Sequence, residues 1–245
     1  MKGDALAEWR LGLGWNEREL ETRLRHLAGT PVQPLRSAGR HYFSQAMIGL
    51  EKAGPPVEGG VFERAWRAIR NYEFSDPTIV VGHFEPKHPL LGRRMLLEIK
   101  VFGLRYLCGV VVGAVDERQS ADSTLKAFRY DTLRGHIESG NEWFVLTKEH
   151  GSGEVWFRIQ AHWELGRFPN WWSRTGFRIL GQRYQLAWHR LAYLRLREIV
   201  GSTGASTGSP RASPLRPIPS GRRLIHVGPY LRTVRPSTAP ARGPR

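Results

Sequence analysis

A succession of six short apolar segments and one long amphipathic segment constrains the fold of this chain more than any other feature. In residues 154–163, apolar side chains occupy every second position, which is the pattern of a half-buried β-strand. Residues 171–200 instead repeat apolar side chains at helical spacing and predict one long helix. The six predicted strands cover residues 79–83, 94–101, 105–115, 125–132, 142–148 and 154–163.

The loops between these strands are short, so consecutive strands are expected to pair in antiparallel fashion. Gly109 and Gly113, within one strand, predict a bend or a close approach by another segment. A curved antiparallel sheet can bury the long helix in its concave face. The predicted fold is therefore α+β and of the helix-grip type, with a curved antiparallel sheet wrapped around a long C-terminal helix. Because helix and sheet do not match perfectly in shape, an apolar cavity is expected between them.

Composition divides the chain into three parts. Residues 1–38 are predicted to be an N-terminal helical extension, and residues 39–200 to be the helix-grip domain. Residues 201–245 contain eight arginines, no acid and half of the sixteen prolines. Such a segment has little to bury, so a disordered Pro/Arg-rich tail is predicted.

Three further elements precede the run of strands. Asn16 is a good N-cap for a helix over residues 16–28, and Glu19 completes a capping box. A partly alternating pattern predicts a strand over residues 40–50. Helical spacing of apolar side chains predicts a second helix over residues 61–72.

The net charge of +15 argues only weakly for a polyanionic partner. Removing the eight arginines of the tail leaves a charge of +7 for the rest of the chain. A basic balance of this kind favours non-specific association. Nucleic-acid binding is therefore expected to be at most weak and non-specific, through the basic tail.

Several classes of protein are not expected. The single cysteine, Cys108, excludes an internal disulfide. The most apolar stretch, residues 101–115, is shorter than the roughly 20 residues that span a bilayer, and the first residues lack a signal-like apolar region. The chain is expected to be a soluble cytoplasmic protein. It has neither a dinucleotide-binding nor a phosphate-loop motif, so no cofactor is predicted.

The segment YDTLRGHIESGNEWF, residues 130–144, concentrates polar chemistry between two predicted strands. His136 could act as a general base near neutral pH. Glu138 or Glu142 could orient it or serve as the acid. The alternative is a structural turn, in which Gly135 and Gly140 supply unusual backbone angles and the carboxylates accept backbone N–H groups.

The same segment resembles the motif F-x-Y-G-T-L-P-G-H-P-E-x-G-E-E-x-F of uncharacterised protein family 0548, found in bacteria and plants. The positions that fit are Phe128, Tyr130, Thr132, Leu133, Gly135, His136, Glu138, Gly140, Glu142 and Phe144. The positions that depart from it are Asp131, Arg134, Ile137 and Asn141. The resemblance covers residues 39–200 and implies the START-like, polyketide-cyclase-like helix-grip fold. It implies no agreed activity, although related helix-grip proteins bind sterols, lipids, plant hormones or polyketides, and a minority act on them.

By this analogy, the leading functional hypothesis is a cavity for a lipophilic small molecule. Trp163 and Trp188 could form its aromatic walls, unless these rings are simply core. Tyr130, Thr132 and Arg129 could offer polar contacts near its mouth. The alternative is an enzyme that acts on such a molecule with His136 and Glu138 or Glu142 as acid and base groups.

A metal site is not predicted. His136, Glu138, Glu142 and His162 are possible ligands by type, but their spacing fits no zinc module. Cys108 lies in an apolar strand, where a thiol behaves as a small hydrophobe.

Overall fold

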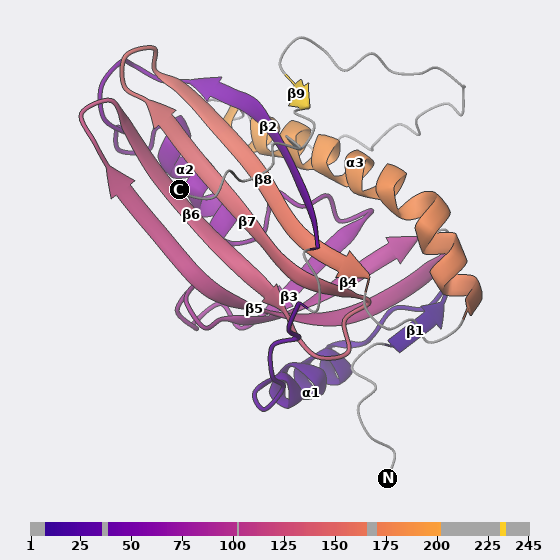
Figure 1. Ribbon diagram of the computed structural model, residues 1–245. Coiled ribbons are helices and arrows are strands. Elements are labelled where there is room, and N and C mark those ends of the chain that lie inside the picture. Colours follow the sequence, from indigo (N-terminus) through magenta and orange to yellow (C-terminus); the bar gives the residue numbers. More distant parts are fainter. Residues whose placement is uncertain (1–7, 36–38, 102, 166–170, 202–230, 234–245) are drawn as a thin grey trace, which may run out of the picture.

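The computed structural model describes residues 8–35, 39–101, 103–165, 171–201 and 231–233 (Figure 1). For residues 40, 165, 171–183 and 231–233 it describes the backbone alone. These residues form one nine-stranded antiparallel sheet and three helices. The helices are α1 (Glu17–Leu27), α2 (Val61–Arg70) and α3 (Trp171–Gly201). The strands are β1 (Glu8–Leu11), β2 (Arg40–Leu50), β3 (Val80–Phe84), β4 (Arg94–Val101), β5 (Leu104–Gln119), β6 (Ser123–Thr132), β7 (Glu138–Glu149), β8 (Glu154–Leu165) and β9 (Leu231–Thr233).

The strand order is β3-β4-β5-β6-β7-β8-β2-β9, and β1 pairs with the beginning of β5. The long strands bend along their length and α3 runs beside them, in contact with β2 and α2 (Figure 1). The predicted α+β helix-grip fold is therefore confirmed. Successive strands from β3 to β8 pair as hairpins, whereas β2 joins the sheet through β8, far away in the sequence.

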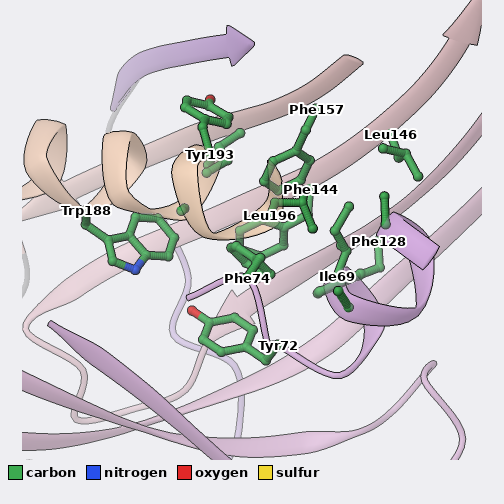
Figure 2. Close-up of a cluster of buried hydrophobic side chains, with 14 of the residues drawn as sticks. Ile69, Tyr72, Phe74, Phe128, Phe144, Leu146, Phe157, Trp188, Tyr193 and Leu196 are labelled. Atoms are coloured by element: carbon green, nitrogen blue, oxygen red, sulfur yellow. The ribbon is translucent and has the colours of Figure 1, made fainter. Parts of the chain in front are cut away.

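The main core fills the space between the concave face of the sheet, α2 and α3. Alternate residues of each strand supply it, as the period of two predicts. Phe144 of β7 lies at the centre of a group of rings, with centroid distances of 5.1 Å to Phe74 and 5.0 Å to Phe128. Figure 2 shows this group together with Tyr72, Trp188 and Tyr193.

A second, smaller core lies on the opposite face of the sheet. There α1 packs against β4 and β5, so that Leu27 is buried with Leu96 and Leu107. The capping box at the start of α1 is confirmed, since Asn16 and Glu19 each bond the backbone N–H of the other.

The seven strands and three helices expected from periodicity are all present. The bend expected at the strand glycines is a β-bulge between Val112 and Ala114, opposite β6. Strand β1 was not predicted, because a four-residue segment shows too little alternation. Strand β7 begins at Glu138 and not at residue 142, because the Ser139-Gly140 pair has the composition of a turn.

Three residues of the Pro/Arg-rich tail, Leu231–Thr233, pair with Ser44–Ala46 of β2. The rest of the predicted disordered tail, residues 202–230 and 234–245, lies outside the described residues. Within the described residues, no helix is both long enough and apolar enough to cross a membrane.

Candidate functional site

The predicted polar segment is a hairpin whose turn contains only residues 133–137. Tyr130 and Thr132 belong to β6, while Glu138 and Glu142 belong to β7. Tyr130, Thr132 and Glu142 thus lie in strands, as predicted, whereas the expectation that Glu138 lies between the two strands was wrong. Because β-strand side chains alternate, Glu138 and Glu142 point to the same, concave side of the sheet.

The turn is fixed by the segment that follows α1. The Gln33 side chain accepts a hydrogen bond from the Gly135 N–H at 3.0 Å and donates one to the His136 carbonyl at 3.3 Å. Val32 forms a bridge with Leu133. Gly135 has a φ of 95°, which non-glycine residues rarely adopt.

Gly140 allows strands β7 and β8 to approach closely at the start of their pairing. A Cβ atom at this position would lie 2.1 Å from the His162 carbonyl oxygen. The Thr132 hydroxyl accepts from the Gly140 N–H at 2.9 Å and donates to its carbonyl at 3.2 Å. Gly140 is thus required for close packing, whereas only Gly135 supplies the unusual angle that was expected of both.

A cavity of about 270 Å³ lies between this part of the sheet and α3. Its described walls are mostly apolar and aromatic, and its polar groups come mainly from the hairpin. The aromatic members of the lining are Trp9, Tyr72, Tyr106, Tyr130, Trp163, Tyr184 and Trp188. The predicted site residues among the lining are Tyr130, Thr132, His136, Glu138, Glu142, Trp163 and Trp188.

Glu142 is buried in the wall of the cavity and has two polar neighbours. The Tyr130 hydroxyl donates to its Oε2 atom, and its Oε1 atom lies 3.9 Å from Nε2 of His189. Burial raises the pKa of Glu142 to about 7, and the hydrogen bond from Tyr130 opposes this rise. The group can therefore exchange a proton near neutral pH.

Glu138 lines the same cavity. Burial, and in second place the charge of Glu142, raise the pKa of Glu138 to about 8. Two carboxyl groups in one apolar cavity resist simultaneous ionisation, because each charge is poorly solvated and repels the other.

His136 contacts Glu138 through the backbone. Its Nδ1 atom accepts the Glu138 N–H at 3.0 Å, and burial lowers the pKa of His136 to about 4. At neutral pH the ring is therefore uncharged and carries its proton on Nε2. This contact fixes the turn.

Sequence reasoning did not single out His189 of α3. It is 2% exposed, and its Nδ1 atom lies 2.6 Å from Oγ of Ser44 in β2. Ser44 in turn lies 2.5 Å from the Tyr193 hydroxyl, and burial lowers the pKa of His189 to about 3. A possible signal was the spacing of four between His189 and Tyr193, which puts both on one face of the helix.

Arg129 is not among the residues that line the cavity. It alternates with Tyr130 along β6, and its guanidinium group binds Asp131 at 3.0 Å and covers the ring of Trp143. Trp188 lines the cavity and also belongs to the main core. Its Nε1 atom donates a hydrogen bond to Ser75 at 3.0 Å.

The four residues considered as metal ligands, His136, Glu138, Glu142 and His162, do not converge on one point. His162 of β8 stacks on His41 of β2, with 3.9 Å between the ring centroids, and lies on the strand face opposite Ala161. In the part of the chain that the structure describes, no three His, Cys, Asp or Glu residues are placed to share an ion.

Three solved structures illustrate which known chains resemble this one. The crystal structure of Ara h 8.0201 has 12% identity and a TM-score of 0.38, covering 67% of this chain and 99% of that chain. A hypothetical protein from Helicobacter pylori has 12% identity and a TM-score of 0.39, and the match covers 71% of this chain and 98% of that chain. Human STARD10 has 7% identity and a TM-score of 0.35, and the match covers 76% of this chain and 81% of that chain. No curated protein matches the sequence.

The family described as "Domain of unknown function (DUF1990)" matches residues 33–193. This span includes the whole hairpin, its anchor at Gln33, and α3 as far as Tyr193. The family resemblance noted at the hairpin motif is confirmed. The chain therefore belongs to the DUF1990 family, whose function is unknown.

Proposed function

We propose that this protein binds a lipophilic small molecule in the cavity between the sheet and α3. The observation that carries the proposal is the cavity itself, about 270 Å³ and lined mainly by apolar and aromatic side chains. Small-molecule sites typically combine such walls with a few polar groups that fix orientation. Here Tyr130, Glu138 and Glu142 would be those groups.

The proposal is tested by native mass spectrometry of gently purified protein, compared with an organic extract of the same sample. A lipophilic molecule at one equivalent is the expected result. A variant with less space, Ala161→Leu, should lose this molecule, because Ala161 lines the cavity. The matched change Ala187→Leu lies on the exposed side of α3 and should retain it. Equal occupancy in both variants would contradict the proposal.

A second candidate is an enzyme that acts on the bound molecule. The observation that favours it is the pair of carboxyl groups in the cavity wall with raised pKa values, since such groups can donate and accept protons near pH 7. Glu138 and Glu142 would then be the acid and base, with His136 holding the turn. Glu138→Gln should abolish turnover of the extracted molecule, even at concentrations that saturate the variant.

A further inference from the structure

We propose that the ligand carries a positively charged nitrogen, which binds between the carboxyl groups of Glu138 and Glu142. This inference rests on the proposed function, because it assigns a chemical class to the ligand of the same cavity. The cation would be an alkyl- or arylammonium group with a lipophilic body.

The first support is that some carboxylate oxygens of Glu138 and Glu142 accept no hydrogen bond from the described residues. Within the described residues, no hydrogen bond reaches the Glu138 carboxyl group, whose residue takes part only through its backbone. Glu142 accepts from Tyr130 through Oε2, which leaves Oε1 without a hydrogen bond of normal length. Both residues line the cavity. An ammonium group has several N–H donors and could bond either of these carboxyl groups.

The second support is charge. Among the described residues that line the cavity there is no lysine or arginine to compensate the two acids. Glu142 is buried and Glu138 is partly exposed. A carboxylate that is shielded from water without a compensating charge is costly, so a cation that enters the cavity lowers this cost, whereas a neutral molecule does not. The aromatic walls act in the same direction, because Tyr72, Tyr130 and Trp188 can present ring faces to a cation.

The third support is the position of His189 of α3 beside Glu142. Nε2 of His189 is buried, has no hydrogen-bond partner among the described residues, and points toward Oε1 of Glu142 at 3.9 Å. A neutral imidazole that accepts from Ser44 at Nδ1 carries its proton on Nε2. That N–H dipole favours the ionised form of Glu142, which is the form that attracts a cation.

Among the described residues that line the cavity, the groups whose pKa values lie between pH 6 and 8.5 are the two carboxyl groups. Burial raises the pKa of the neighbouring Tyr72, Tyr106 and Tyr130 well above their usual value, and it also raises the pKa of Tyr193 and Cys108. The pKa values of His136 and His189 are lowered to about 4 and about 3. Ammonium affinity should therefore rise with pH as Glu142 and then Glu138 ionise.

The experiment titrates the full chain with octylammonium, octan-1-ol and octanoate, three probes that share a tail and differ in the head group. At pH 7.5 the Kd for octylammonium should be at least about tenfold lower than that for octan-1-ol. Octanoate should bind most weakly. From pH 6 to 8.5, octylammonium should bind more tightly and octan-1-ol less tightly.

Glu138→Gln and Glu142→Gln should each reduce the preference for octylammonium to less than threefold and leave octan-1-ol binding in place. Glu149→Gln, on the same strand but exposed and outside the cavity, should keep the full preference. If octan-1-ol binds as tightly as octylammonium in the unaltered chain, the ammonium inference is wrong and the cavity proposal stands. If none of the three probes binds, both are wrong.

Discussion

Glu138 and Glu142 place two ionisable groups where ionisation is unfavourable, and this should be measurable in the stability of the protein. Their folded pKa values, about 8 and about 7, are raised above the ordinary value of 4.5. Between pH 4.5 and about pH 8, these two groups bind more protons in the folded state than in the unfolded state. Their contribution to stability therefore falls as pH rises. His136 and His189, with lowered pKa values, act in the opposite direction, but only below about pH 6.5.

We therefore predict that the free energy of unfolding falls between pH 6.5 and pH 8, where the effect of the two carboxyl groups exceeds that of the two histidines. The expected decrease is about 2 kcal/mol. Urea denaturation at several pH values in this range measures it. The double variant Glu138→Gln/Glu142→Gln should show a nearly flat profile. A stability that rises with pH over this range would contradict the burial of the two acids.

Tyr130 offers a second test at the level of one hydrogen bond. Its hydroxyl donates to Glu142 and favours the ionised carboxylate, so Tyr130→Phe should raise the pKa of Glu142 above about 7. Titration followed by carbon NMR of labelled carboxyl groups reports this directly. Tyr106→Phe also removes a cavity hydroxyl, but one that donates to the Gly135 carbonyl, and should leave Glu142 unchanged.

The acids of this site could be named from the sequence, but their partners could not. Glu138 and Glu142 belong to a recognisable local motif, and their spacing on a strand puts them on one face. The contact between Glu142 and His189 depends on the register of α3 against the sheet. Such long-range packing leaves no local pattern, so the sequence did not point to His189.

At the scale of elements, the hairpin β6–β7 and its neighbour β8 form the rigid frame of the site. Periodicity predicted the strands, because alternation is a local property. It placed the start of β7 too late, because Ser139 and Gly140 resemble turn residues. Their actual role is long-range: Ser139 donates to the Pro34 carbonyl at 2.8 Å, and Gly140 allows β8 to approach.

Gly140→Ala should therefore be strongly destabilising. The added methyl group would meet backbone and not a movable side chain, so strands β7 and β8 would have to separate at the cavity. The expected loss is roughly 3 kcal/mol of unfolding free energy or more. Gly151→Ala is the matched control, since a Cβ atom there meets nothing within 4 Å. Thermal unfolding compares the two, and equal melting temperatures would show that the close approach is unimportant.

For the molecule as a whole, the main question is whether the basic tail has a function separate from the domain. The tail carries eight arginines and no acid, whereas the cavity lies within the domain. The tail could neutralise phosphate groups without reading sequence. Its role remains a prediction, as does a cytoplasmic location.

We predict that the full chain binds nucleic acid weakly and that salt abolishes this binding. A chain ending at Gly201 should bind none, while the lipophilic ligand of the cavity is retained. Filter binding at about 50 and 200 mM salt measures the difference, because each phosphate contact steepens the salt dependence. Sequence-specific binding by the shortened chain would show that the domain itself recognises nucleic acid.

The pairing of β2 with β8 also has a consequence for synthesis of the chain. Strand β2 leaves the ribosome early, but its partner β8 follows roughly 100 residues later, which corresponds to about 5–20 s of translation. During that interval β2 has an unpaired edge and an apolar face without a helix to cover it. The hairpins from β3 to β8 can form in order as they emerge, whereas β2 and α3 can dock only at the end. Newly made chains should therefore depend on chaperones in proportion to the delay before β8 appears.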